Sequence, residues 1–121
     1  MANDALLPAA LDISRKRGDT FMFSIVFNEG GSPKDFTGYS FKLAVNTDSK
    51  PTDVTNQVFQ LSGAAITGDA SGNVNILVGT SEADQLPKTY YYELEGTDGA
   101  GLIRTLAAGK WVVVQDIVKA I

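Results

Sequence analysis

The sequence predicts an all-β protein, an antiparallel sandwich of seven to eight strands with one short helical turn near residues 80–86. Two observations favour this architecture. Apolar residues alternate with polar ones in short runs, as they do in strands that bury one face. Turn-forming residues separate these runs, and the chain contains 12 glycines and 4 prolines. Its 121 residues have the length of one domain, which buries about two-thirds of the surface that its unfolded chain exposes.

Two terminal segments flank the predicted sandwich. Residues 1–10 show no hydrophobic period and include a proline, which predicts a flexible arm that docks only through Leu6 and Leu7. The sandwich domain is expected over residues 11–115, and residues 116–121 form a C-terminal tail. The apolar residues of this tail are Ile117, Val118 and Ile121.

The strongest strand signal is the run DTFMFSIVF at residues 19–27. Its large apolar residues on alternate positions are Phe21, Phe23, Ile25 and Phe27. An extended backbone points all four to one face, and their burial contributes about 6–12 kcal/mol as an upper figure. Met22 and Val26 make the opposite face less polar than usual. We expect this run to be the central strand, with every later strand arranged to cover it.

The other strands follow from alternation and from the turns between them. A short strand at residues 11–13 leads into a charged turn at residues 14–18, where Gly18 can adopt a positive φ. Later strands are predicted at residues 39–46, 57–61, 64–67, 73–78 and 89–96. Loops or tight turns are predicted at residues 28–33, 47–56, 68–72 and 98–101.

The last stretch, residues 102–114, changes its hydrophobic parity part-way. One long strand with a β-bulge at Ala108-Gly109 explains the extra residue and the glycine, and a short hairpin is the alternative. Residues 80–86 are the helical candidate, because hydroxyl residues can cap it, acidic residues occupy its first turn and Pro87 ends it.

Composition and charge exclude several classes of function. The formal net charge is -4, which provides no electrostatic footprint for nucleic acid or for an anionic membrane. The chain has no cysteine and no histidine, so thiol nucleophiles, disulfides and the usual metal ligand are missing. No apolar run is long enough to span a membrane, and the N-terminus lacks the pattern of a secretory signal. We expect no cofactor, no metal and no small-molecule substrate, in a protein made in a cytoplasm.

Two overlapping basic motifs each have a structural alternative. Arg17-Gly18-Asp19 spells an integrin-binding tripeptide, but three given residues recur by chance and the glycine already fits a turn. The basic run Arg15, Lys16 and Arg17 fits a solvated turn, and docking against an acidic partner remains open.

Asp69, Ser71 and Asn73 are spaced like the first ligands of a calcium loop. Such a loop needs a glycine at its sixth position and a glutamate at its twelfth, where this chain has Val74 and Thr80. A hairpin turn is the favoured interpretation.

Glu93 and Glu95 share one face of a strand and could form a carboxylate pair for glycoside hydrolysis. Contact with a cross-strand cation such as Arg104 is the simpler role. A serine or threonine nucleophile would need a base, and the chain has no histidine to serve as one. We therefore do not expect an enzyme.

Trp111 and the three consecutive tyrosines at positions 90–92 fit either a sugar-stacking platform or the core. Tyr90 and Tyr92 share the inward parity of Leu94, and Trp111 lies in a valine-rich strand, so the core is favoured. A tyrosine near the start of this late strand also fits the corner hydrogen bond of such sandwiches.

Three segments together resemble a known family. They are Asp12-Ile13 with Arg17-Gly18-Asp19-Thr20-Phe21, then Asp35-Phe36-Thr37-Gly38-Tyr39, then Leu86-Pro87 with Tyr90 to Leu94, Asp98-Gly99 and Leu106. Their order and spacing are similar to those of small immunoglobulin-like modules of tailed-bacteriophage virions. The nearest are the N-terminal domains of baseplate upper proteins and related tail, neck or head accessory proteins. The resemblance spans residues 11–115 and departs at Lys88-Thr89, where that family commonly has glycine after Leu-Pro.

The resemblance implies an immunoglobulin-like sandwich with a non-enzymatic structural role in a virion. Such an accessory, decoration or connector module would bind other virion proteins and form homo-oligomers. The expected assembly contacts are Leu6, Leu7, Ile117, Val118, Ile121, Arg15, Lys16 and Arg17. The alternative is a carbohydrate-binding or host-adhesion module, which would expose aromatic rings beside polar side chains.

Overall fold

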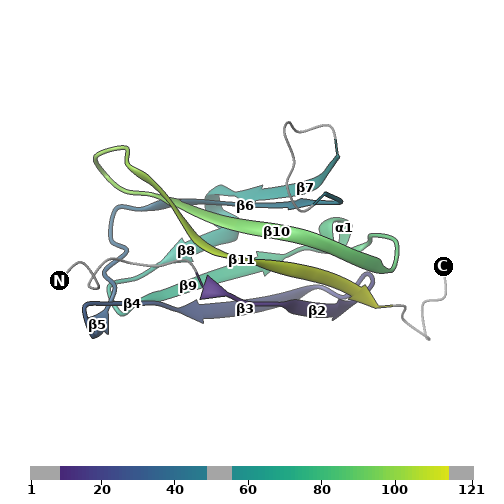
Figure 1. Ribbon diagram of the computed structural model, residues 1–121, viewed down its shortest axis with the longest axis horizontal. Helices are drawn as coiled ribbons and strands as arrows, with labels where there is room; N and C mark the ends of the chain where they lie inside the picture. The colour runs from purple at the N-terminus through teal and green to yellow at the C-terminus, as the bar shows by residue number, and fades with distance from the viewer. Residues whose placement is uncertain (1–8, 49–55, 115–121) are drawn as a thin grey trace.

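The structure is a computed structural model that describes residues 9–48 and 56–114, and it consists of two facing β-sheets (Figure 1). The strands are β1 (Ala9–Ala10), β2 (Ile13–Lys16), β3 (Phe21–Val26), β4 (Asn28–Glu29), β5 (Ser32–Pro33), β6 (Ser40–Asn46), β7 (Gln57–Ser62), β8 (Ile66–Gly68), β9 (Asn73–Val78), β10 (Lys88–Thr97) and β11 (Ile103–Val114). The helical elements are a 3-10 turn, η2 (Gly63–Ala65), and α1 (Thr80–Ala83).

The larger sheet contains six strands in the order β1-β11-β10-β6-β7, with β2 also paired to β11. The smaller sheet contains three strands in the order β3-β9-β8, and β4 and β5 form a separate hairpin. Within the two sheets the pairs are antiparallel, except that β1 and β2 run parallel to β11. This arrangement, with a helical turn between β9 and β10, is an immunoglobulin-like sandwich. The predicted all-β sandwich is confirmed, but the described part has eleven strands, three of them only two residues long, instead of the predicted seven to eight.

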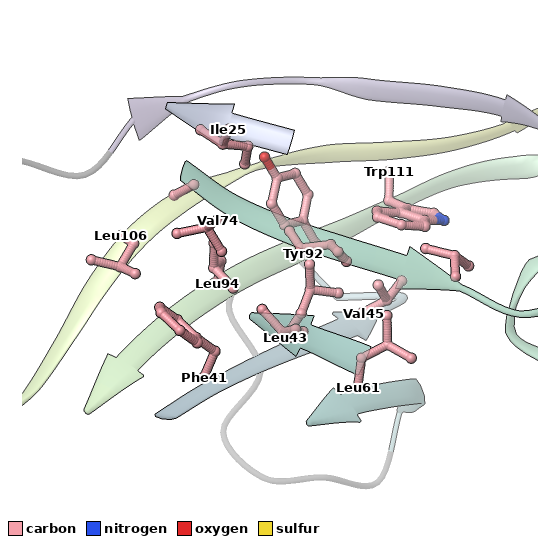
Figure 2. Packing of buried hydrophobic residues seen from close by; sticks show 14 of the residues in the cluster. Ile25, Phe41, Leu43, Val45, Leu61, Val74, Tyr92, Leu94, Leu106 and Trp111 are labelled. Atoms are coloured by element: carbon pink, nitrogen blue, oxygen red, sulfur yellow. The ribbon is translucent and has the colours of Figure 1, made fainter. Parts of the chain in front are cut away.

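The core lies between the two sheets, where alternate residues of each strand point inward (Figure 2). Trp111 is its largest side chain and is 2% exposed. Four other rings lie with their centroids 5.6–6.1 Å from that of Trp111, and they belong to Phe21, Phe23, Phe59 and Tyr92. The buried aliphatic residues around them include Leu43, Val45, Val74, Ile76 and Leu94. The inward positions predicted for these strands are confirmed.

The prediction that residues 19–27 form the central strand is wrong. The four alternating apolar residues do face inward, with Ile25 and Phe27 buried and Phe21 and Phe23 half-buried. However, β3 pairs with β9 alone among the described strands, so β9 is the middle strand of the smaller sheet. Alternation shows which face a strand buries, and a strand at the edge of a sheet buries one face as fully as a strand in the middle.

The N-terminal edge of the larger sheet is interrupted between β1 and β2. Here the Asp12 Oδ1 atom accepts a hydrogen bond from the Lys110 N–H at 2.9 Å, and the Leu11 carbonyl accepts one from the Tyr92 hydroxyl at 2.6 Å. Gly109 permits this approach, because a Cβ atom at that position would lie 2.1 Å from the Leu11 carbonyl oxygen. A glycine in β11 is therefore required by the N-terminal segment that packs against it.

The last strand, β11, is continuous as predicted, but its bulge does not lie at Ala108-Gly109. Its register with β10 shifts between Leu94 and Glu95, which leaves Leu106 as the extra residue. Leu106 and Ala107 are both fully buried, so the inward parity changes between them. The glycine has a different cause, the close approach of the N-terminal edge.

The charged turn is shorter than predicted. Residues 14–16 belong to β2, because pairing with β11 supplies their backbone hydrogen bonds, and only Arg17 and Gly18 form the turn. Gly18 has the predicted positive φ, 81°. The strand predicted at residues 64–67 begins only at Ile66, because η2 precedes it. The predicted loop at residues 47–56 lies mostly outside the described residues.

The helical turn α1 is one turn long and ends at Ala83, short of the predicted residue 86. Beyond it, the Tyr90 hydroxyl donates a 2.7 Å hydrogen bond to the Leu86 carbonyl. This is the tyrosine corner that the sequence predicts. Lys88 and Thr89 already belong to β10, so the corner closes without the glycine that the resembling family has there.

Candidate functional site

The candidate contacts at the two chain ends lie outside the described residues. They are Leu6, Leu7, Ile117, Val118 and Ile121. The predicted arm and tail therefore remain predictions, and the basic run is the part of the expected contact set that the structure describes.

Two of the three basic residues at positions 15–17, Arg15 and Arg17, make side-chain contacts within the domain. The Arg15 guanidinium carbon lies 4.7 Å from the centroid of the Phe21 ring, close enough for a cation–π contact. The Arg17 Nε atom lies 2.8 Å from Asp84 Oδ1, and the Gly18 N–H donates to the Ala83 carbonyl at 2.9 Å. The tripeptide at residues 17–19 is thus held against the end of α1 and half-buried, which favours its structural interpretation.

The motif spaced like a calcium loop forms a hairpin turn. The Asp69 carboxylate accepts hydrogen bonds from the Ser71 N–H at 2.8 Å, and from the Asn73 N–H and the Asn73 side-chain amide at 3.1 Å each. The bonds from Asn73 and Ser71 lower the pKa of the Asp69 carboxyl group. Its oxygens are thus occupied by the turn itself. In the part of the chain that the structure describes, no three acidic residues gather to hold a metal ion.

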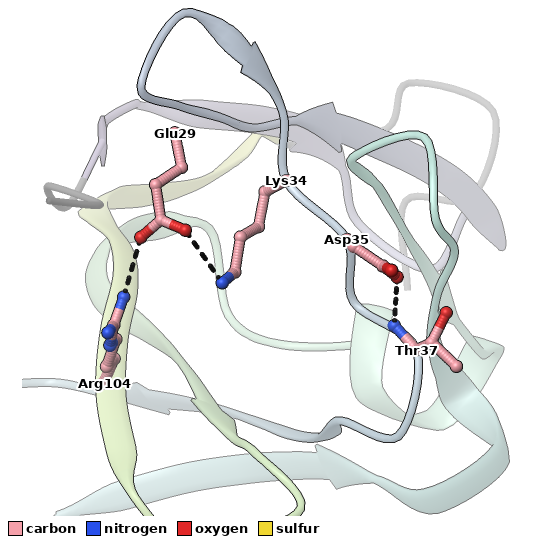
Figure 3. A network of polar contacts seen from close by, with 5 residues as sticks. All are labelled: Glu29, Lys34, Asp35, Thr37 and Arg104. Carbon is pink, nitrogen blue, oxygen red and sulfur yellow. Dashed lines mark hydrogen bonds and ion pairs between the residues drawn. The ribbon is translucent and has the colours of Figure 1, made fainter. Parts of the chain in front are cut away.

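The cation expected to face Glu93 and Glu95 is bound elsewhere. Arg104 Nη1 lies 3.1 Å from Glu29 Oε2, and the other oxygen of Glu29 lies 3.0 Å from Lys34 Nζ (Figure 3). The hydrogen bond from Lys34 is the largest cause that lowers the pKa of the Glu29 carboxyl group, and Arg104 adds to it. This network joins the β4–β5 hairpin to β11, so the prediction that Arg104 pairs with the strand glutamates is wrong.

The aromatic residues form no exposed platform. Every phenylalanine, tyrosine and tryptophan of the chain lies in the described part and is buried or half-buried. Trp111, Tyr90 and Tyr92 belong to the core, as the favoured interpretation predicts. Tyr91, on the opposite face of β10, is half-buried.

The smaller sheet has an outer face that is apolar and carries no charge. Its three strands, β3, β9 and β8, contain no charged residue, whereas 20% of the whole chain is charged. On its outer face Met22 and Val26 are each 62% exposed, and Leu77 is 44% exposed. Met22 and Leu77 are directly opposite each other on β3 and β9. We call this surface the β3–β9 face; it consists of Met22, Ser24, Val26, Asn75 and Leu77.

The outer face of the larger sheet is different, because charges of both signs lie on it. It carries Lys42 from β6, Glu93 and Glu95 from β10, and Lys110 from β11. A face of that kind is well solvated, whereas the β3–β9 face leaves large apolar side chains in water without charged neighbours on its own strands. Exposed apolar patches on soluble domains commonly mark sites of protein–protein contact.

No protein-family model matches the chain, and no curated protein matches its sequence.

The sequence contains a signal for part of the β3–β9 face. The apolar outward positions of Met22 and Val26 were apparent from alternation alone, but Leu77 could not be placed beside them before the pairing of β3 with β9 was known. Among the described helices, none is long and apolar enough to cross a membrane. The arrangement is an exposed, uncharged sheet surface that lies on two paired strands.

Proposed function

We propose that this protein is a non-enzymatic structural protein of a bacteriophage virion that acts through protein–protein assembly. It would serve as an accessory, decoration or connector module of the tail, baseplate, neck or head. The observation that supports an assembly role most strongly is the β3–β9 face, an uncharged sheet surface with exposed Met22, Val26 and Leu77. Its partners would be other virion proteins and further copies of the chain.

The side-chain chemistry of the domain supports a structural role over a catalytic one. The chain has no histidine or cysteine to act as base or nucleophile. Three of its acidic residues are engaged in turns or ion pairs that stabilise loops, namely Glu29, Asp35 and Asp69. Such residues position the backbone and leave their carboxylates already hydrogen-bonded.

The virion part of the proposal is supported by the resemblance of three segments. In the fold these segments include the turn before β3, the entry into β6 and the corner before β10, while Asp98-Gly99 and Leu106 lie in the β10–β11 hairpin of the larger sheet. Turns and strand starts of this kind are features that a family of related sandwiches would share. We propose that the protein is made in the host cytoplasm and becomes part of the particle.

Localisation on purified particles tests this proposal. An antiserum raised against the recombinant domain should label tailed phage particles from the source lysate in immunogold electron microscopy, and peptides of the chain should co-purify with those particles through a density gradient. A chain that stays in the soluble fraction, with unlabelled particles, contradicts the proposal.

A glycan array serves as the matched test of the alternative function. A carbohydrate-binding module should retain specific glycans, and aromatic platforms usually provide the stacking surface for them. Because all rings of this chain are buried or half-buried, we expect no specific retention. Strong binding to one glycan class would favour the adhesion role over the assembly role.

A further inference from the structure

Among the described residues, the edge of β3 that lies away from β9 has no strand partner. This free edge of β3 presents backbone groups as well as apolar side chains. One position beyond the last β3–β9 pair, Val26 with Asn73, the Phe27 N–H donates to the Gly72 carbonyl at 2.8 Å, so the Phe27 amide points toward the β9 side. The direction of the backbone N–H and C=O groups alternates from residue to residue along an antiparallel strand. The backbone groups of the odd-numbered residues of β3 therefore point toward β9. The backbone N–H and C=O groups of Met22, Ser24 and Val26 therefore point away from β9, toward the free edge.

The other edges of the described sheets carry features that discourage pairing with another chain. The edge strand β2 holds Arg15 and Lys16, and β8 has only three residues. The register of β7 with β6 shifts between Val45 and Asn46, which indicates a β-bulge in that edge. By contrast, β3 has six residues in unbroken register, with no charge, no proline and no bulge.

We propose that a second copy of this chain pairs with the free edge of β3, antiparallel and centred on Ser24. The two three-stranded sheets would then join into one continuous sheet across a two-fold axis. In this register Ser24 lies opposite Ser24 of the second copy, and Met22 lies opposite Val26 of the second copy. Each of these pairs exchanges backbone hydrogen bonds, because these residues are the ones whose polar groups face the edge.

The distribution of charge favours a second copy of the chain as the partner at this edge. Each chain has a net charge of -4, so two copies repel each other unless they meet where the charge is absent. The smaller sheet is such a place, because none of its three strands carries a charged residue. The antiparallel register also opposes Met22 to Val26, which brings together the two most exposed apolar residues of β3 on each side of the axis.

The dimer should be weak. A six-residue edge is about 20 Å long. A contact confined to this edge buries less surface area than the interface of a typical permanent complex. We expect it to form at high protein concentration and to separate on dilution. This inference rests on the proposed assembly function, for which it names one partner, but its test is separate. A chain that stays monomeric in solution but is found on phage particles would overturn the pairing and leave the assembly function in place.

Two double variants that differ only in the sign of one charge test the register. In Met22→Lys/Val26→Glu the introduced charges of opposite sign face each other across the axis, whereas in Met22→Lys/Val26→Lys like charges do. Both sites are 62% exposed, so the fold should tolerate either change. Sedimentation velocity over about a hundredfold range of concentration gives the dissociation constant of each protein.

We expect the wild-type chain and the Lys/Glu variant to dimerise, and the Lys/Lys variant to bind about tenfold more weakly or not at all. The Lys/Lys variant has the lower net negative charge, so general repulsion between chains cannot explain such a loss. A wild-type chain that is monomeric throughout overturns the proposal, as does equal behaviour of the two variants. If either variant misfolds, amide hydrogen exchange on the wild-type chain decides: the amides of Met22, Ser24 and Val26 should exchange more slowly at high concentration, and unchanged rates overturn the proposal.

Discussion

Replacement of Gly109 by alanine should destabilise the domain strongly, although it adds a single methyl group. The new Cβ atom would lie 2.1 Å from the Leu11 carbonyl oxygen and 2.9 Å from Asp12 Oδ1. The Leu11–Asp12 segment must therefore move away from β11. Three hydrogen bonds depend on its position, from the Leu11 N–H to the Ala108 carbonyl at 3.0 Å, from the Lys110 N–H to Asp12 at 2.9 Å, and from the Tyr92 hydroxyl to the Leu11 carbonyl at 2.6 Å.

The expected loss follows from these contacts. Two hydrogen bonds contribute about 0.5–1.5 kcal/mol each, and a buried hydroxyl left without a partner costs about 1–3 kcal/mol. The Gly109→Ala variant should lose about 2–6 kcal/mol of unfolding free energy, a large part of the about 5–15 kcal/mol of a typical domain. Urea unfolding followed by the fluorescence of the single, buried Trp111 measures this loss.

Gly99→Ala is the matched control, because a Cβ atom at Gly99 would meet nothing within 4 Å. Its unfolding free energy should stay within about 0.5 kcal/mol of the wild-type value. Tyr92→Phe should also cost less in the Gly109→Ala background than in the wild-type chain, because both changes remove the same bond to Leu11. Equal urea midpoints for Gly109→Ala and Gly99→Ala would refute the described approach of the N-terminal segment to β11.

Three further predictions concern the core and the titrating groups. Leu94→Ala, at a fully buried site, should lose about 2–5 kcal/mol in urea unfolding, whereas Leu102→Ala, at a site 62% exposed, should lose little. Because Lys34 and Arg104 lower the pKa of Glu29, its ion pairs stabilise the fold above about pH 4.5, and this contribution disappears as the pH falls through the lowered pKa. Glu29→Gln should therefore cost about 0.2–1 kcal/mol of unfolding free energy at neutral pH and should flatten the dependence of stability on acid pH. An acid unfolding profile that is unchanged in the variant would contradict this. Burial raises the pKa of Tyr92 to about 12, so folded stability should fall as pH rises from about 10 toward 12, and Tyr92→Phe should reduce that slope in unfolding experiments at alkaline pH.

Alternation along the chain is a local property, and the features that depend on it were predictable. The inward faces of β6, β9 and β10, the hairpin turn at Asp69 and the corner hydrogen bond of Tyr90 all follow from spacing within a few residues. Strand pairing is not local. The position of β3 at an edge, and the inclusion of residues 14–16 in a strand, depend on partners that lie 47 or more residues away in the chain.

The candidate site also combines features that are local in the sequence with features that depend on strand pairing. Met22 and Val26 could be assigned to an outward face from sequence alone, but the face itself required the pairing that brings Leu77 beside Met22. The ion pairs of Arg104 with Glu29 and of Arg17 with Asp84 join residues more than 60 positions apart. No spacing rule relates such residues, so the sequence suggested a nearer partner for Arg104 and none for Arg17.

Electron cryomicroscopy of purified phage particles from the source lysate is the decisive measurement for the proposed role. The maps should contain a two-layered sandwich that accommodates this chain, with Met22, Val26 and Leu77 covered by a neighbouring subunit. Particles that lack such density, or a bound domain whose β3–β9 face is open to solvent while the charged face of the larger sheet makes the contacts, would contradict the account.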